Sequence, residues 1–215
     1  MKKFKKSDLL IGIIFTLLFI SIGVIAAVNM RFIYYLDVKL LNIPEMSGLE
    51  PNVILENYNA LIDYNSPFYK GDLIFPSLPS SPEALQHFTE VKDIFVSFYY
   101  IGVITLIISI IIVIYKALKK DYSYLKISAI TVVVIPVIAA IAASLNFDAT
   151  FVIFHKLFFR NDFWLFDPVT DPVITILPDT FFLHALIIII VTVLLGSIIL
   201  LLCSNKYRNR RDSYR

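Results

Sequence analysis

The amino-acid sequence predicts an all-α membrane protein: four transmembrane helices with a small extracytoplasmic cap from two outer segments. The chain has 215 residues, is 58% hydrophobic and has a mean hydropathy of +0.78, well above a typical soluble domain. Four apolar runs contain no Asp, Glu, Lys or Arg. Each is long enough to cross a bilayer of about 30 Å, which takes roughly 20 residues. The charged residues are divided unevenly between the segments that connect these runs.

The four apolar runs are the predicted spans of a single membrane domain. They cover residues 9–28, 94–114, 127–145 and 181–203. Each is expected to be a helix, because a helix satisfies its own backbone hydrogen bonds in lipid. The first run follows a basic N-terminus, as a signal peptide does. However, the run is longer than the apolar region of a signal peptide, which has about 7–15 residues, and no A-x-A cleavage site follows it. We interpret it as an uncleaved anchor.

Basic residues predict the orientation in the membrane. The two tails and the loop between the second and third runs hold 13 of the 19 Lys and Arg but only 3 of the 17 acids. The positive-inside rule places these segments, and both termini, in the cytoplasm. The outer segments, 30–93 and 146–180, are then extracytoplasmic. The basic residues concerned are Lys2, Lys3, Lys5, Lys6, Lys116, Lys119, Lys120, Lys126, Lys206, Arg208, Arg210, Arg211 and Arg215.

Local patterns predict several elements in the first outer segment. Apolar residues at helical spacing favour a short amphipathic helix near 53–64, and residues 68–76 are expected to form an extended turn and strand. A further helix is expected to run without a break from a cap near residue 81 into the second span. Ser80 with Glu83 fits a capping box, whereas Ser81 with Pro82 fits an N-cap and a first helical residue.

Each outer segment carries one histidine, and both are predicted at one membrane depth. His87 precedes the span at 94 by seven residues, about 10 Å along a helix. His155 follows the third span and shares a helical stripe with Phe151, Phe154, Phe158 and Phe159, which predicts a helix lying in the outer interface. A lone interfacial histidine is more often structural, but two at the same depth suggest a shared site. His184, at the start of the fourth span, is assigned no role.

Other residue types exclude several kinds of site. Cys203 is the only cysteine, so neither an intrachain disulfide nor a multi-cysteine metal cluster is expected. H-E-x-x-H and G-x-S-x-G motifs are missing from the sequence, and we expect no metal and no cofactor. The basic tails fit membrane topology and anionic lipid, so no nucleic-acid partner is expected. The Asp-Pro steps at Asp167 and Asp171 fit ordinary turns. The oligomeric state is not predicted.

Two stretches resemble the signature regions of a bacterial membrane-protein family. They are SPFYKGDLIFPSLPSSPEALQHFTEVKDIF (66–95) and FHKLFFRNDFWLFDPVTDPVITILPDTFF (154–182). In both, the chain resembles the small four-span proteins of the lipoprotein intramolecular transacylase family. The first stretch carries Glu90 where the family pattern H-x-x-D-V-K has an aspartate, so a carboxylate is retained. The second matches at Phe154, His155, Phe158, Phe159, Asn161, Asp162, Trp164, Asp167, Pro168, Asp171, Pro172 and Pro178.

The resemblance implies an acyltransferase of the bacterial cell membrane with its active site at the outer leaflet. Such proteins move the sn-2 acyl chain of a lipoprotein's S-diacylglyceryl-cysteine to the cysteine α-amine, which gives the lyso-form lipoprotein. The implied partners are a diacylated lipoprotein substrate and membrane lipid. The resemblance implies catalytic roles for His87 and His155. Glu90 and Asp162 are expected to support them, and the expected substrate-binding residues are Tyr69, Lys70, Phe154, Phe158, Asn161 and Trp164.

Two other functions remain open at this point. One is a non-enzymatic membrane protein whose outer cap binds lipid or an envelope partner. The other is a membrane metalloenzyme that uses the two histidines and an acid. Mass spectrometry of lipoprotein N-termini would distinguish the non-enzymatic protein from the transacylase. The metal content of purified protein would identify the metalloenzyme.

Overall fold

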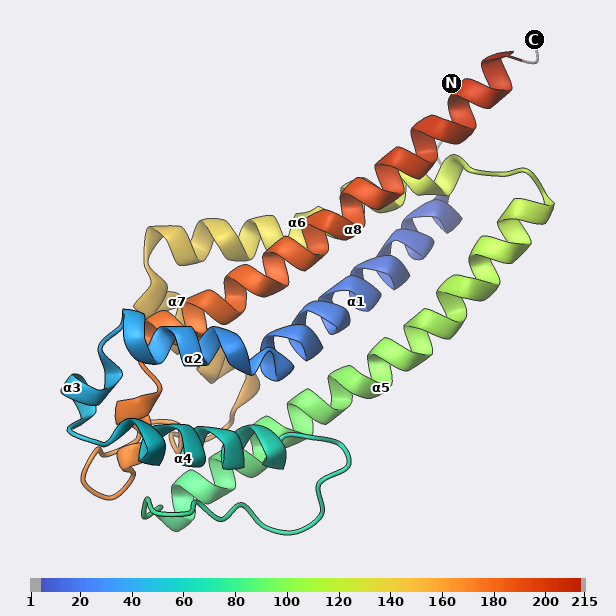
Figure 1. Cartoon of the computed structure of the whole chain (residues 1–215). Helices are drawn as coiled ribbons and strands as arrows, with labels where there is room; N and C mark the ends of the chain where they lie inside the picture. The colour runs from blue at the N-terminus through green and yellow to red at the C-terminus, as the bar shows by residue number, and fades with distance from the viewer. Residues whose placement is uncertain (1–4, 214–215) are drawn as a thin grey trace. The chain divides into compact units, whose positions relative to one another are not determined.

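The computed structural model describes residues 5–213, with side chains over 5–207. Several basic residues of the predicted cytoplasmic tails (Lys2, Lys3, Arg208, Arg210, Arg211, Arg215) therefore lie outside the described side chains. All regular elements of the described backbone are helices, which confirms the predicted all-α class, and no strand occurs within residues 5–213 (Figure 1). Its elements are α1 (Lys6–Asn29), α2 (Arg31–Leu40), α3 (Ile43–Ser47), α4 (Pro51–Tyr64), α5 (Pro82–Leu118), α6 (Ser123–Leu145), α7 (Phe147–Phe158), the 3-10 helix η1 (Pro172–Ile176) and α8 (Asp179–Ser213).

Four of these helices are long and apolar enough to cross a membrane. They are α1, α5, α6 and α8, and they contain the four apolar runs of the sequence. Helix α5 has 37 residues, about 55 Å at 1.5 Å per residue. It is therefore much longer than a membrane span, and its first turns, which include His87, precede the apolar run that begins at residue 94.

The chain divides into two compact units. The first comprises residues 1–24, 98–141 and 187–215. Its buried apolar core consists of Ile11, Phe15, Leu18, Tyr124, Leu125, Ala129, Val132, Val193 and Leu200. Glycine allows close helix contacts in this unit: a Cβ on Gly196 of α8 would lie 2.6 Å from the ring of Phe19 on α1. Small residues at such contacts let transmembrane helices approach closely enough to gain van der Waals packing.

A charged cluster joins three helix ends in the first unit. Lys116 Nζ lies 3.6 Å from Asp8 Oδ1 and 3.1 Å from Asp121 Oδ2, and Lys5 Nζ also lies 3.1 Å from Asp121 Oδ2. Ser123 Oγ lies 2.7 Å from Asp121 Oδ1. The hydrogen bond from Ser123, followed by those from Lys116 and Lys5, holds the pKa of Asp121 well below its usual range. The cluster connects the start of α1 with the end of α5 and the start of α6.

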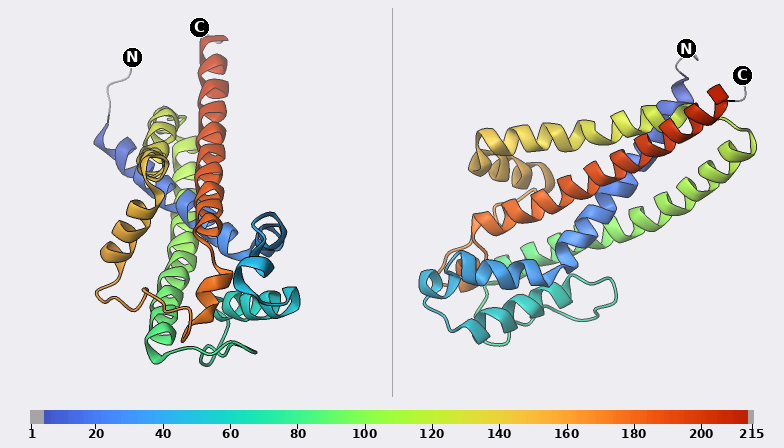
Figure 2. Two further views of the ribbon diagram at one scale, coloured as in Figure 1. Left: turned by 90° about the vertical axis from the view of Figure 1, so that its left-hand side faces the viewer. Right: turned by 45° about the horizontal axis from the view of Figure 1, so that its top comes forward.

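The second unit, residues 25–97 and 142–186, brings both outer segments into one core. Tyr34 of α2 stacks on Tyr58 of α4 with ring centroids 3.6 Å apart, and its hydroxyl donates to the Ile176 carbonyl of η1. Helices α2 and α4 lie side by side (Figure 2). The two segments that are predicted to form the cap therefore share one core. Its buried core is Tyr34, Val38, Ile43, Ile54, Tyr58, Leu61, Tyr64, Leu73, Phe75, Leu78, Phe88, Val173, Ile176 and Leu177.

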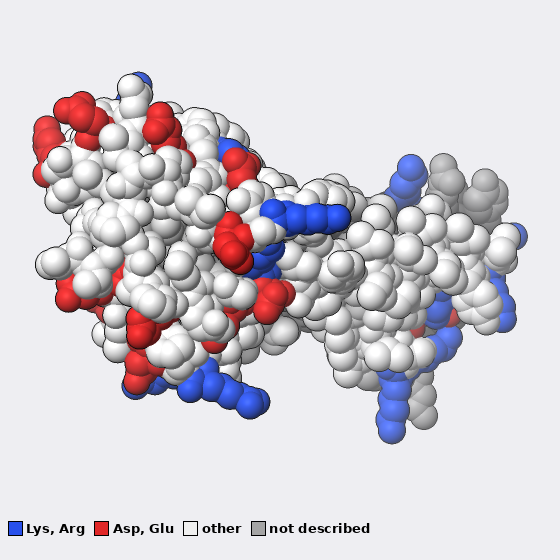
Figure 3. Space-filling model, turned by 90° about the horizontal axis from the view of Figure 1, so that it is seen from below, with Lys and Arg blue, Asp and Glu red and all other residues white. Residues whose placement is uncertain are grey.

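The second unit also carries most of the acidic side chains. It contains 14 of the 17 Asp and Glu residues of the chain. On the face shown in Figure 3, they gather over this unit. The uneven division of charge seen in the sequence therefore coincides with the division into two compact units.

Most of the local predictions for the first outer segment are confirmed. Helix α4 includes the predicted helix, and α5 begins at Pro82 with Ser81 as its N-cap, because the Ala84 N–H donates to Ser81 Oγ. The strand predicted over 68–76 is wrong. Residues 65–81 form an irregular connection, held by Asn57 of α4, whose side-chain oxygen accepts from the N–H groups of Ser77 and Leu78. A side chain thus satisfies two backbone donors just after the segment that was predicted as a strand.

Candidate active site

His87 lies near the start of α5, in the second unit. Two hydrogen bonds fix this helix start: Ser81 Oγ accepts from the Ala84 N–H, and Asp171 accepts from Ser81. The His87 side chain is buried, with 5% of its surface exposed. Its ring centroid lies 4.6 Å from Phe159 and 5.5 Å from Phe166. The histidine is therefore enclosed by aromatic rings.

His155 comes from α7 in the same unit. Asn146 caps this helix by accepting from the Ala149 N–H, and the His155 side chain is buried, with 9% of its surface exposed. Its ring centroid lies 4.1 Å from Phe151 and 4.7 Å from Trp164. We call the rings around the two histidines the aromatic cage. It comprises Phe88, Phe151, Phe154, Phe159, Trp164 and Phe166.

The two histidines lie next to each other although 68 positions separate them in the sequence. Their ring centroids are 5.9 Å apart, and their planes are inclined by 34°. Phe159 contacts both rings, at 4.6 Å from His87 and 5.5 Å from His155. At this separation, one small substrate group can contact both imidazoles within ordinary hydrogen-bond lengths.

Both imidazoles are neutral at pH 7. Burial, and then the proximity of His155, lowers the pKa of His87 from 6.5 to about 4. Burial likewise lowers the pKa of His155, although a hydrogen bond to the Phe151 carbonyl opposes the shift. The physical cause is that an apolar environment disfavours the charged imidazolium. Neutral imidazoles can accept protons, which is the form that a general base requires.

The hydrogen bonds distinguish the nitrogens of the two rings. His155 Nδ1 lies 2.8 Å from the Phe151 carbonyl oxygen. Because a carbonyl only accepts, Nδ1 carries the proton, and Nε2 of the neutral ring keeps a lone pair. His87 Nδ1 is buried and has no hydrogen-bond partner within the described residues. The site therefore offers one oriented basic nitrogen and one uncommitted nitrogen.

Glu90 lies one helical turn after His87 and is held by the second outer segment. Asn161 Nδ2 donates to both of its carboxylate oxygens, at 3.0 and 3.2 Å. Gln86 Nε2 also donates to Glu90, at 3.3 Å. A pocket of about 320 Å³ adjoins this contact, and Phe159 of the aromatic cage forms part of its wall. Asn161 and Glu90 therefore connect α5 to the segment that follows α7.

Asp171 is a further positioning residue that the sequence did not identify. It is 3% exposed and accepts from the Ser81 N–H at 2.6 Å and from Ser81 Oγ at 2.9 Å, while Thr170 Oγ1 donates to it at 2.8 Å. The carboxylate before η1 thus holds the N-cap of α5, Ser81, which precedes the histidine at 87 by six positions. Its Asp-Pro step gave no sign of this, because its partner lies 90 positions away.

The other predicted site residues lie at different distances from the histidine pair. Trp164 packs directly on His155, and Phe154 contacts the same ring at 5.5 Å with about half of its own surface exposed. Phe158 packs on Phe154 and lines the small pocket. Within the described residues, Asp162 is exposed and its side chain makes no hydrogen bond.

Tyr69 and Lys70 lie in the connection between α4 and α5. The Tyr69 ring contacts Tyr64, and its carbonyl accepts from Lys92 Nζ at 3.2 Å. Lys70 is exposed. Neither residue contacts the two histidines in the described part of the chain, so the structure places both outside the aromatic cage.

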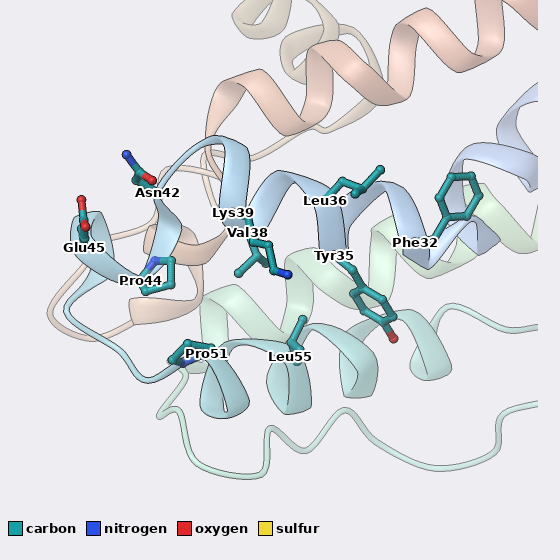
Figure 4. Close-up of a pocket in the computed structure, with 10 residues that line it drawn as sticks. All are labelled: Phe32, Tyr35, Leu36, Val38, Lys39, Asn42, Pro44, Glu45, Pro51 and Leu55. Atoms are coloured by element: carbon teal, nitrogen blue, oxygen red, sulfur yellow. The ribbon is translucent and has the colours of Figure 1, made fainter.

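A larger groove of about 690 Å³ lies elsewhere in the second unit, between α2, α3 and α4 (Figure 4). Its walls are mainly apolar, with Tyr35 and Leu55 facing each other across it. None of the predicted site residues lines it. Its size alone does not make it the active site, because no histidine lines it.

Comparisons with known proteins decide the family. The family model described as "Lipoprotein intramolecular transacylase Lit" matches residues 9–182. The chain belongs to the Lit family. The predicted acyltransferase class is confirmed, and the Lit family membership favours it over the two alternatives. A comparison with curated proteins gave no match.

Solved structures of a Lit protein support the same conclusion. The membrane-integral lipoprotein intramolecular transacylase Lit from Bacillus cereus is 34% identical, with a TM-score of 0.90 over 96% of this chain and 98% of that chain. Two variants of the same protein also match, each with one histidine substituted. The arginine variant is 34% identical, with a TM-score of 0.84 over 97% of this chain and 95% of that chain. The alanine variant is 33% identical, with a TM-score of 0.86 over 96% and 94%. The multi-pass membrane fold of this Lit family member is therefore confirmed.

Proposed function

We propose that this protein moves the sn-2 acyl chain of a lipoprotein's S-diacylglyceryl-cysteine to the cysteine α-amine, and that His87 and His155 catalyse the transfer. The observation that carries the proposal is the pair of neutral, buried imidazoles with ring centroids 5.9 Å apart. Family membership supports the reaction class. The product is the lyso-form lipoprotein, with one O-acyl and one N-acyl chain.

The reaction begins with proton removal from the substrate amine. An α-amine has a pKa of about 7.7–8.0 and must be unprotonated to attack the ester carbonyl, so its ammonium form first loses one proton to water. We assign the base to His155 Nε2, because the hydrogen bond to Phe151 places the proton of this ring on Nδ1. As the new C–N bond forms, the amine proton passes to Nε2.

The reaction ends with proton return to the glyceryl oxygen. When the C–O bond to the sn-2 oxygen breaks, His87 supplies the proton that the departing alkoxide needs, and proton exchange between the two rings restores the pair. Overall, an ester and an amine are converted to an amide and an alcohol, and this reaction needs no external acyl donor. Because amine and ester belong to one molecule, bringing them together gives a high effective molarity.

The remaining residues are proposed to hold the substrate. Phe154 and Phe158, about half exposed beside the cage, suit contact with acyl chains. Glu90, held by Asn161, is proposed to attract the protonated amine before it loses its proton. Tyr69 and Lys70 suit contact with the polar part of the substrate. Asp162 has no part in this proposal.

We also infer the membrane sidedness from charge. Both termini are proposed to be cytoplasmic and the histidine pair to lie at the outer leaflet, because the first unit carries 13 of the 19 basic residues. This depth suits a substrate whose ester and amine lie at the lipid–water boundary. Lipid of that leaflet would then surround the exposed apolar residues of α7.

A crossover experiment tests the reaction. Purified protein would be given two synthetic diacylglyceryl-cysteine lipopeptides, one isotopically labelled in both its acyl chains and its peptide. Mass spectrometry should find lyso-form products that are fully labelled or fully unlabelled. His184→Ala, a histidine variant outside the cage, should also convert the substrate. Mixed products would contradict intramolecular transfer, and no product from the unmodified protein would contradict the proposal.

A further inference from the structure

Trp164 is the only member of the aromatic cage with a hydrogen to donate. The other five members are phenylalanines, which have no polar hydrogen. The indole ring of Trp164 lies 4.7 Å from the His155 ring by centroid. The chain has a single tryptophan, so the indole N–H at this position is a distinct chemical feature of the site.

This N–H has no acceptor in the part of the chain that the structure describes. The Trp164 side chain is 9% exposed, its Nε1 is fully buried, and nothing within the described residues accepts a hydrogen bond from it. Leaving a buried donor unsatisfied opposes folding, and native structures rarely do so without a reason. A phenylalanine would fill apolar space without this penalty. The N–H is therefore explained if the substrate supplies its acceptor.

Apart from the His87 ring, the other donors near the histidine pair that we identify are already engaged. Asn161 Nδ2 donates to Glu90, and the Ser81 N–H donates to Asp171. His155 Nδ1 donates to the Phe151 carbonyl. Among these groups, only the Trp164 indole remains available to a new acceptor, and its ring lies against the His155 ring.

We propose that the Trp164 indole N–H donates to the carbonyl oxygen of the scissile sn-2 ester and stabilises the oxyanion that forms there. The inference rests on the proposed function. When the amine nitrogen bonds to the ester carbon, the carbonyl electron pair moves to oxygen, and that oxygen accepts the indole hydrogen. When the C–O bond to the glyceryl oxygen breaks, the electron pair returns and the amide carbonyl forms. A donor already in place is most effective where charge develops.

The single tryptophan permits a clean test. Growth of a tryptophan auxotroph on 3-benzothienylalanine replaces the indole N–H by sulfur at position 164 alone and keeps the ring shape. The kcat on a diacylglyceryl-cysteine lipopeptide should fall on the order of 10²-fold, as expected for the loss of one oxyanion donor, while KM changes by less than about threefold. Trp164→Phe should show a similar loss of kcat. The melting temperature of the benzothienyl protein should be unchanged or raised, because a buried unsatisfied donor has been removed.

Three outcomes would overturn the assignment. The first is a benzothienyl protein that keeps kcat within about threefold of the unmodified value. The second is a rise in KM with unchanged kcat, which would indicate a contact made equally in the ground state. The third is an equal loss of kcat in a control grown on 5-fluorotryptophan, which keeps the N–H.

The unmodified protein and His155→Ala are measured beside these samples. An inactive unmodified protein would refute the proposed function itself. The role of Trp164 alone would be refuted by a different result: the unmodified protein is active, His155→Ala is inactive, and the benzothienyl protein is unaffected.

Discussion

The burial of His87 affects stability as well as chemistry. Its pKa is lowered to about 4 in the folded protein, whereas in an unfolded chain it is near 6.5. Between these values the unfolded chain binds more protons, so stability falls as the pH falls from about 6.5 to about 4 and is constant above that window. In detergent, the free energy of unfolding should fall by about 2 kcal/mol between pH 7 and pH 5 from this residue alone.

His87→Phe is the matched variant for that measurement. It fills the same apolar environment with a ring that does not titrate, so its melting temperature should depend less on pH than that of the unmodified protein. An identical pH dependence in both proteins would show that His87 is not buried in its neutral form.

Individual residues also show what the sequence can and cannot predict. The histidines at 87 and 155 were predictable because each lies on a helix whose distance from an apolar run can be counted. The nitrogen of His155 that carries the proton could not be predicted from the sequence, because it depends on a single hydrogen bond to the Phe151 carbonyl. The unsatisfied N–H of Trp164 was equally hidden, because burial and missing partners are properties of the folded chain.

Between elements, Asp171 fixes the start of α5 to the segment before η1. Asp171→Ala removes the acceptor for the Ser81 N–H and Oγ, so it should lower stability by about 1–3 kcal/mol and lower kcat more than it changes KM. Asp167→Ala is the matched control: this residue also precedes a proline, but it is exposed and its side chain accepts only from the Val169 N–H. It should change stability by no more than about 0.5 kcal/mol.

Thermal melts and steady-state kinetics on the same preparations check this prediction. Asp171→Asn keeps one acceptor oxygen, so it should recover part of the stability and part of the kcat that Asp171→Ala loses. Equal effects of Asp171→Ala and Asp167→Ala would show that the contact with Ser81 does not position α5.

A second contact between elements joins α2 to α8. His184 Nδ1 lies 2.9 and 3.0 Å from the two carboxylate oxygens of Asp37, which is 2% exposed. His184→Ala leaves this buried carboxylate without its partner and should destabilise the protein by about 1–3 kcal/mol, with kcat retained below the melting range. Adding Asp37→Asn should restore part of the stability. A double variant that is less stable than His184→Ala would argue against the pairing.

The same elements show why parts of the fold were missed. Helix α4 and the Ser81 cap follow local rules of spacing and capping, so the sequence was sufficient. No strand forms over 68–76, and just after this segment Asn57, from another element, accepts from the N–H groups of Ser77 and Leu78. The contact of Asp37 with His184 spans 147 positions, and that of Asp171 with Ser81 spans 90. Contacts at such separations leave no periodic pattern for a single sequence to show.

At the scale of the whole molecule, the division of basic residues determines the expected orientation in the membrane. The charge division predicts that a reporter fused at Arg215 is cytoplasmic and that one inserted near Pro51 is extracytoplasmic. Paired alkaline phosphatase and fluorescent-protein fusions at the two positions should therefore give opposite answers. An extracytoplasmic C-terminus would place the histidine pair on the side opposite to the lipoprotein anchor and contradict the proposed site.

The central claim is that His87 and His155 act as one catalytic unit, and a double-mutant comparison tests it most directly. Initial rates of lyso-form production would be measured by mass spectrometry for the unmodified protein, His87→Ala, His155→Ala and the double variant, at matched amounts of folded protein. Each single variant should lose about 10²–10⁴-fold in rate. The double variant should lose little more, because residues that act together are strongly non-additive. Full lyso-form production by either single variant, or losses that multiply in the double variant, would contradict the account.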